Sequence, residues 1–303
     1  MTARQASLLG LLAMLWGASY LLIKYALEDF SPGTIVFART LLGALVLYAI
    51  VRAQGGEAVA RLSELRRRPG TAALLGLVAI AAPFLLISFG ELEVPSGLTA
   101  VLIASAPLWV AIFAPVADPT EKVAGRQAAG LVLGIAGVAL LVGVESIDST
   151  WEFLGAVAIV GAAAFYSLSS FMVKRAYRDI PAVTTSFISV GAGCLLTLPV
   201  AAVSPPTSAP SLRGVAALVV LGVAGTAFAF VIFYRLIAEL GAGRASLVSY
   251  LIPPLSLGYG ALLLDERITT AAIAGLVLIL AGVALATRAP TTATGAPEGT
   301  PAA

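Results

Sequence analysis

The feature that most constrains this chain is a succession of ten apolar stretches, each about 20 residues long. A helix of about 20 residues is what crosses the ~30 Å hydrocarbon core of a bilayer. Hydrophobic residues make up 59% of the 303 residues and charged residues only 11%, whereas a soluble domain carries about 25% charged residues. The chain is therefore predicted to be an all-α integral membrane protein. The composition excludes a soluble enzyme and a nucleic-acid binder.

Charges, prolines and glycines divide the apolar stretches into ten predicted transmembrane helices. An Arg-rich loop is expected at 52–70, and the other connections are short. Residues 288–303 are rich in Pro, Thr and Ala, and we predict a disordered cytoplasmic tail there. The helices are expected near 8–27, 33–51, 71–90, 96–116, 127–144, 153–173, 183–203, 214–234, 243–264 and 270–287.

Residue types that are missing narrow the possible chemistry. The chain has no His and a single cysteine, Cys194, so His-based metal sites, disulfides and Cys clusters are excluded. No HExxH or GxSxG motif is present. The sequence therefore predicts no catalytic residue, no metal site and no cofactor.

The distribution of Lys and Arg predicts the orientation. With the N-terminus in the cytoplasm, 14 of the 18 basic residues fall on the cytoplasmic side, and Lys24, Arg39, Arg213 and Arg267 fall on the outer side. This bias follows the positive-inside rule. We expect a multi-pass protein of the cytoplasmic membrane with both termini inside the cell.

The two halves of the chain resemble each other. The run that begins at Gly130 (GLVLGIAGVAL) shares nine of eleven residues with the run that begins at Gly275 (GLVLILAGVAL). We predict two five-helix repeats, at 7–144 and 153–287. Because five is odd, the second repeat would be inverted relative to the first, which is the architecture of alternating-access transporters.

Several segments resemble the EamA-type transporters of the drug/metabolite transporter superfamily. They are WGASYLLIKYAL from Trp16, the APLW around Pro107, and the ending LLLDERITTAAIAGLVLILAGVAL. The resemblance covers roughly residues 7–287 and implies a ten-helix carrier of small metabolites, amino acids or drugs, often an exporter. Two positions depart from the family pattern: Asp265 stands where a glycine is common, and Ile252 where many members have an acidic residue.

Polar and aromatic residues recur along one face of the first and sixth predicted helices. Trp16, Tyr20 and Lys24 are spaced i, i+4, i+8, which places them on one helix face. Tyr166 and Ser170 follow the same spacing. We interpret these residues, with Ser19 and Tyr234, as lining a substrate cavity. The alternative is that they are interfacial residues at the ends of the helices.

Arg39 lies within the second predicted helix, at a depth similar to that of Lys24. A charge there should face a cavity or a partner. In one interpretation Lys24 and Arg39 form a basic pair that attracts a substrate carboxylate or phosphate. In the other, Arg39 forms a structural ion pair with Glu28, Asp29 or Glu91.

Other residues suggest hinges and helix packing. Pro107 and Pro253 occupy matching places in the repeats and are the hinge candidates. Gly130 and Gly134 are suited to close helix packing. Glu121 and Glu266 stand where they could cap the helices that follow them. No carboxylate is evident in the middle of a predicted span, so the coupling ion stays open.

These observations predict a secondary transporter of small metabolites, such as amino acids or related compounds, working in export by alternating access. The alternative is an exporter of drugs or other amphipathic compounds. A membrane-embedded enzyme and a channel are more remote alternatives. The expected partners are a small-molecule substrate and the lipid bilayer, and the oligomeric state stays open.

Overall fold

The computed structural model describes residues 1–63, 67–117, 125–145, 149–205, 209–240, 245 and 248–286, and this part of the chain is helical without any strand. Glu121 and the tail at 288–303 lie outside the described residues. The helices of the first half are α1 (Ala3–Leu27), α2 (Pro32–Gln54), α3 (Gly56–Ala60), α5 (Pro69–Gly76), α6 (Ala82–Gly90), α7 (Ser96–Ile103), α8 (Ala106–Ala117) and α9 (Arg126–Glu145). Those of the second half are α10 (Thr150–Ala176), α11 (Ala182–Ala202), α12 (Leu212–Gly222), α13 (Ala229–Leu240), α15 (Val248–Leu263) and α16 (Thr270–Ala286).

Helical segments overlap all ten predicted ranges. Within the described residues, eight segments are long and apolar enough to cross a membrane, and the apolar helices α15 and α16 are shorter. Polar residues mark the first turn of several helices. Ser31 accepts a hydrogen bond from the Thr34 amide at the start of α2, and Ser211 does the same for Gly214 at the start of α12, as N-cap residues do. The chain is a multi-pass membrane protein.

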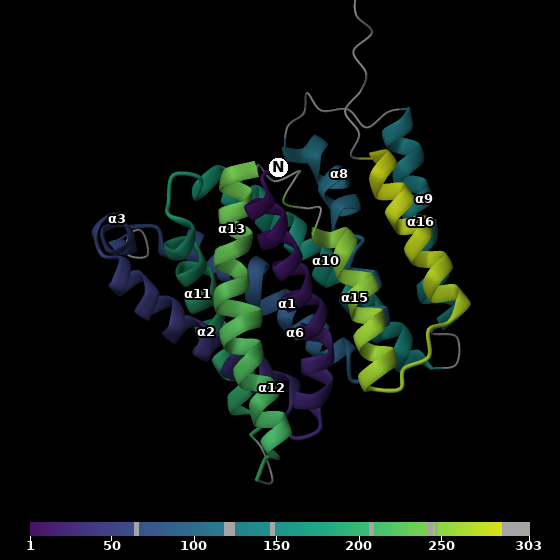
Figure 1. Ribbon diagram of the computed structural model, residues 1–303, viewed down its shortest axis with the longest axis horizontal. Helices are drawn as coiled ribbons and strands as arrows, with labels where there is room; N and C mark the ends of the chain where they lie inside the picture. The colour runs from purple at the N-terminus through teal and green to yellow at the C-terminus, as the bar shows by residue number, and fades with distance from the viewer. Residues whose placement is uncertain are drawn as a thin grey trace, which may run out of the picture.

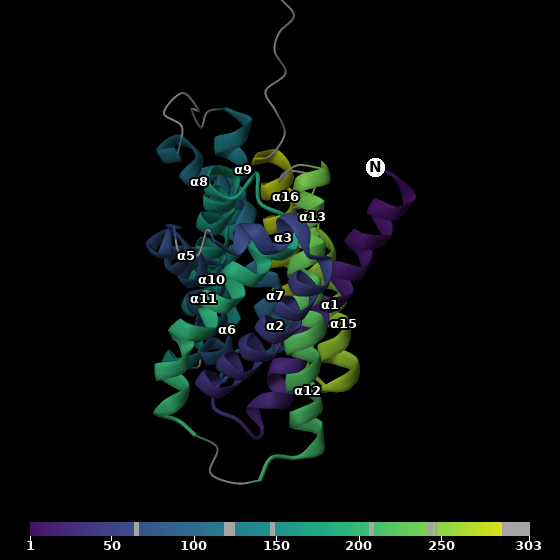
Figure 2. The same ribbon diagram turned by 90° about the vertical axis from the view of Figure 1, so that its left-hand side faces the viewer.

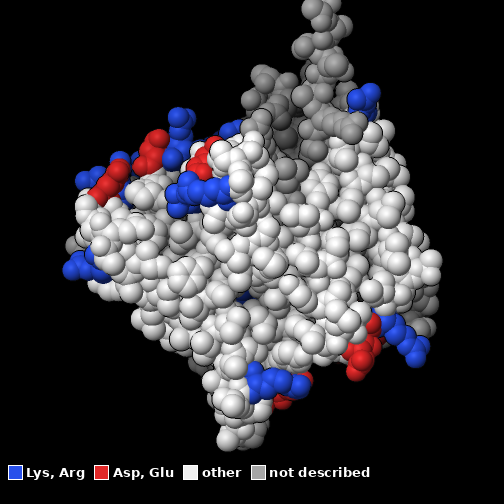
Figure 3. All heavy atoms as spheres, viewed as in Figure 1, with Lys and Arg blue, Asp and Glu red and all other residues white. Residues whose placement is uncertain are grey.

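Consecutive long segments run in opposite directions through the bundle. The N-terminus lies at the top of both views and the start of α12 at the bottom (Figures 1 and 2). Charged side chains gather toward these two ends, and a broad apolar belt separates them on the face shown in Figure 3. This pattern suits a bilayer around the middle of the bundle. Below, the end that carries the N-terminus is called the N-terminal end and the other the far end.

The two halves pack against each other through two long helix pairs, α2 with α11 and α9 with α16. Small residues bring α9 and α16 together, as expected for Gly130 and Gly134. A Cβ at Gly282 would lie within 2.6 Å of the Gly130 carbonyl oxygen, and a Cβ at Gly137 within 2.8 Å of the Leu278 Cβ. These glycines therefore serve packing within the chain.

Three irregular segments interrupt the long helices. Residues Leu77–Ala81 (η2), between α5 and α6, and Val223–Phe228 (η3), between α12 and α13, are π-helical. The path from α7 to α8 breaks at residues 104–105, just before Pro107. Pro253, by contrast, lies inside the uninterrupted helix α15. The break at Pro107 has a local cause, because proline has no N–H for the helical hydrogen-bond ladder.

Candidate functional site

A cavity of about 270 Å³ lies between helices of both halves. This volume is just below the usual range for ligand pockets, about 300–1,000 Å³. Seven of the eight predicted cavity residues line it, and Lys24 does not. The seven are Trp16, Ser19, Tyr20, Arg39, Tyr166, Ser170 and Tyr234. That they bind a substrate stays a prediction.

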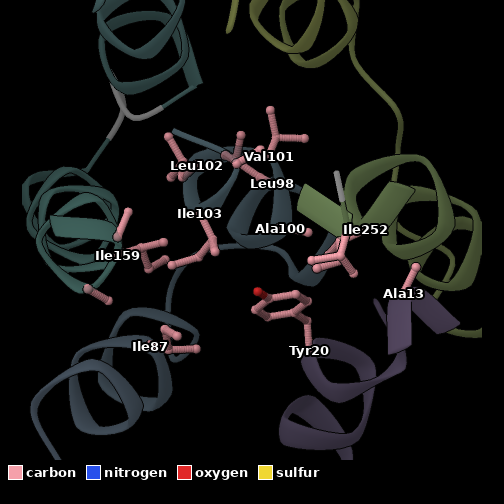
Figure 4. Packing of buried hydrophobic residues seen from close by; sticks show 14 of the residues in the cluster. Ala13, Tyr20, Ile87, Leu98, Ala100, Val101, Leu102, Ile103, Ile159 and Ile252 are labelled. Carbon is pink, nitrogen blue, oxygen red and sulfur yellow. The ribbon is translucent and has the colours of Figure 1, made fainter. Parts of the chain in front are cut away.

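The cavity extends from the middle of the bundle toward the N-terminal end. Val248, the first residue of α15, and Ile237, three residues before the end of α13, both line it. Tyr20 bounds the cavity deeper in the bundle, where its hydroxyl points into the space between Ile87, Ile103 and Ile252 (Figure 4). Of the α1 residues that line the cavity, Ile23 is the last along the chain, four residues before the end of this helix.

Aromatic rings form one wall of the cavity. The Trp16 ring lies 5.0 Å from that of Phe233 and 5.9 Å from that of Phe230, measured between centroids. Phe230 in turn contacts Tyr234 edge to face at 5.7 Å. These distances fall in the range for favourable aromatic pairs. The wall is therefore preorganised to stack against an apolar or planar part of a ligand.

Arg39 is the charged residue among the described residues that line the cavity, and it is only 3% exposed. Its Nε and Nη2 donate hydrogen bonds to the Thr226 hydroxyl oxygen at 3.3 and 3.2 Å. Its guanidinium carbon lies 4.0 Å from the centre of the Phe84 ring, a cation–π contact. Nη1 donates to no hydrogen-bond partner in the described part of the chain, so its N–H groups are left as unused donors.

The predicted ion-pair partners of Arg39 are wrong. Glu28 pairs with Arg213, and Asp29 accepts a hydrogen bond from the Ser211 hydroxyl. Glu91 is fully buried, but its carboxylate forms no hydrogen bond with Arg39 or with any other described residue. A neutral hydroxyl and an aromatic face hold the guanidinium instead, so its positive charge is left uncompensated by contact.

Thr226 is a site residue that the sequence analysis missed. It lies in η3, and its hydroxyl donates to the carbonyl of Leu221, five residues earlier, at 2.8 Å. Glycines bring this segment close to α2: a Cβ at Gly43 would lie 2.9 Å from the Thr226 methyl carbon. The π-helical turn and the close approach together aim Thr226 at Arg39. Such π-helical turns are frequent at functional sites.

Lys24 and Arg39 do not form the predicted basic pair in the cavity. The Lys24 Nζ atom donates to the backbone carbonyl oxygen of Glu91 at 2.5 Å. This contact joins α1 to the end of α6 on the far side of the cavity. Lys24 therefore helps to close the far end, and among the described residues Arg39 alone presents its charge to the cavity.

Contacts between the two halves also close the far end. The Glu266 carboxylate accepts hydrogen bonds from the Ser96 amide at 2.7 Å, the Ser96 hydroxyl at 2.9 Å and the Gly97 amide at 3.0 Å. Glu266 therefore caps α7 of the first half, and the expectation that it caps the helix that follows it is wrong. Thr269 caps that helix, α16, by accepting from the Ala272 amide.

The backbone of Asp265 explains one departure from the family pattern. Its φ of 54° lies in the left-handed region, which glycine adopts freely and Asp tolerates better than most residues. The turn is tight, because the Glu266 amide donates a hydrogen bond back to the Gly260 carbonyl oxygen at 3.1 Å. This conformation directs Glu266 toward the start of α7.

The described residues contain no cluster of three His, Cys, Asp or Glu side chains that could hold a metal ion. The polar atoms in the cavity are mostly hydroxyls. The hydroxyls of Ser19 and Ser170 donate to carbonyl oxygens one turn earlier, those of Leu15 and Tyr166, at 2.9 and 3.1 Å. Because their protons are used in these bonds, the two hydroxyl oxygens can only accept hydrogen bonds from a ligand. The site thus combines one cation, aromatic faces and hydroxyl groups, which suits reversible binding.

Comparisons with known proteins identify the family of the chain. The uncharacterized transporter YoaV of Bacillus subtilis is 26% identical over 89% of this chain and 92% of its own length. A probable terminal-alkyne amino-acid exporter of Streptantibioticus cattleyicolor is 26% identical over 90% of each chain. A crystal structure with 22% identity shares the fold at a TM-score of 0.65, covering 94% of this chain and 97% of that one. The model of the EamA-like transporter family matches residues 4–143 and again 153–288, and the chain belongs to this family.

Proposed function

We propose that the chain is a secondary carrier that exports small carboxylate-bearing metabolites, amino acids or close relatives, across the cytoplasmic membrane. The observation that carries the proposal is the buried guanidinium of Arg39, which faces a cavity of aromatic rings and hydroxyls. Arginine matches the planar geometry of a carboxylate, and the rings suit an apolar side chain. The similarity to a probable amino-acid exporter supports the same substrate class.

The carrier works by alternating access between two inverted five-helix repeats. The two separate matches to the family model support the repeat. So do the π-helical segments, which occupy the third predicted span of each half. In the conformation described here the cavity extends toward the N-terminal end, and contacts between the halves close the far end.

Counterflow in proteoliposomes tests this function. Vesicles preloaded with an unlabelled amino-acid mixture are expected to accumulate a labelled amino acid transiently, and carboxylate-bearing compounds should compete for this uptake. A carrier produces this transient accumulation, or overshoot, because it exchanges substrates. Unlabelled substrate inside the vesicle is carried out, and its exit returns the cavity to the outward-facing state that binds labelled substrate. Empty liposomes are the control. Uptake that does not saturate would identify a channel, and turnover of lipid would identify an enzyme.

Export of drugs or other amphipathic compounds is the second candidate function. The ring cluster of Trp16, Phe230 and Phe233 favours it, because aromatic faces bind apolar and cationic groups as well. The same vesicles separate the two functions. If amphipathic cations compete for the overshoot and amino acids do not, the carboxylate proposal is wrong.

The excess of basic residues at the N-terminal end supports a cytoplasmic location for that end. In a background with Cys194 replaced by alanine, we expect Glu57→Cys to resist an impermeant thiol reagent in intact cells. Glu93→Cys, in the turn between α6 and α7, should react. Both glutamates are exposed, so location rather than burial decides the result. Reaction at Glu57→Cys alone would invert the proposed orientation.

A further inference from the structure

Glu91 lies at the far end, in the turn between the candidate spans Pro69–Gly90 and Ser96–Pro115. Its side chain is completely enclosed, with an exposed fraction of 0%. Both carboxylate oxygens lack a hydrogen-bond partner among the described residues. A buried polar group without a partner is rare in folded proteins and needs an explanation.

The charged groups that face Glu91 are bound elsewhere. Lys24 of α1 donates to the backbone carbonyl of Glu91 and not to its carboxylate. Arg39 of α2 is held by Thr226 and Phe84. Glu266, in the turn before α16, is a second carboxylate and is used in capping α7. None of these groups neutralises the Glu91 side chain by direct contact.

The remaining neighbours of Glu91 are neutral. Tyr20 of α1 is the other titratable side chain that faces it. The Thr99 hydroxyl of α7 lies close by but donates to the Pro95 carbonyl at 3.1 Å. On the side of α10, Gly155 and Ile159 pack against Gly90 and offer no hydrogen-bond donor from a side chain.

An ionised carboxylate in these surroundings is unfavourable. Burial raises the pKa of Glu91 well above its ordinary value, and the charge of Glu266 acts in the same direction. Lys24, Arg39 and the nearby Thr99 hydroxyl oppose this rise. A buried carboxylate that lacks hydrogen-bond donors usually takes up a proton, because the neutral acid loses much less hydration on burial.

We propose that Glu91 is a proton-binding site of this carrier, occupied while the far end is closed and emptied when the far end opens. The proposal rests on the alternating-access function proposed above. Opening would admit water to the turn at Glu91 and allow its ionised form to be hydrated beside Lys24. Because the closed state binds one more proton than the open state, acid favours the closed state.

The infrared spectrum of the purified protein tests the occupied site without any substrate. At pH 7 exposed carboxylates are ionised, so a carbonyl band of a protonated carboxylic acid reports a buried one. We expect such a band in the wild type and in Glu93→Gln, the control with an exposed glutamate in the same turn. Glu91→Gln should lose it. A band that is absent in the wild type, or retained in Glu91→Gln, overturns the proposal.

The exchange rate in proteoliposomes tests the link to opening. We expect acid to slow exchange in the wild type and in Glu93→Gln. Glu91→Gln, which mimics the protonated side chain, should exchange slowly at every pH. If Glu91→Gln keeps the pH dependence of the wild type, the link to opening is wrong. If the infrared band is present but no exchange occurs with any substrate, the transport proposal fails while the proton site stands.

Discussion

Replacing Arg39 by glutamine is expected to weaken transport of carboxylate-bearing substrates about 10- to 100-fold, while neutral analogues are transported at nearly the original rate. Losing one hydrogen bond to a charged group costs about 1.5–3 kcal/mol, and each 1.4 kcal/mol is a factor of about ten. The effect should be selective because Arg39 is the charged residue among the described lining residues. Competition in the counterflow assay, expressed per folded carrier, measures it.

Two further variants separate substrate binding from a structural role. Arg39→Lys should restore only part of the selectivity, because an ammonium group cannot reproduce the bidentate guanidinium. Thr226→Val removes the hydroxyl that positions Arg39 but keeps the charge, so its loss should be smaller than that of Arg39→Gln. Equal losses for charged and neutral substrates would make Arg39 a scaffold residue.

Most of the fold could be predicted because its cause is local. A membrane-spanning helix must satisfy its own backbone hydrogen bonds within the bilayer, so an apolar stretch of sufficient length already defines the element. The residues that begin a helix are also recognisable locally. Ser31 is the N-cap of α2 and Pro32 is its first residue. The π-helical segments η2 and η3 were not predicted, since no periodic pattern in the sequence marks them.

Part of the candidate site could be predicted from helical spacing. The interval of four residues places Trp16 and Tyr20 on one face, and both line the cavity. Lys24 continues that spacing but lies nearer the far end, where a backbone carbonyl of α6 binds it. Spacing along one helix predicts which residues share a face, but it cannot predict how deep the cavity extends along that face.

The partners of the charged residues depend on contacts between distant parts of the sequence. Arg39 binds a hydroxyl 187 residues away, and Glu266 caps a helix 170 residues away. The predicted partners were carboxylates for Arg39 and the adjacent helix for Glu266. Neither prediction holds, because the two halves pack face to face and the hydroxyl that Arg39 binds and the helix that Glu266 caps each belong to the other half.

Filling the cavity should stop transport altogether. Val110 of α8 lines the cavity and is 37% exposed, so a larger side chain at this position can occupy the space that a substrate would use. We expect Val110→Trp to reduce counterflow to the level of empty liposomes. Val132→Trp is the matched control, because Val132 is 69% exposed on α9 and does not line the cavity. It should transport at close to the wild-type rate.

Blocking the cavity after the protein has folded excludes misfolding as the cause of lost transport. In the background with Cys194 replaced by alanine, Val110→Cys should transport normally until a bulky maleimide reacts with it, and the reaction should then abolish transport. Because the cavity extends toward the N-terminal end, a reagent supplied from that side should act faster than the same reagent supplied from the far side. Full counterflow after complete modification would mean that substrate does not pass through this cavity, and the site built around Arg39 would then not be the transport site.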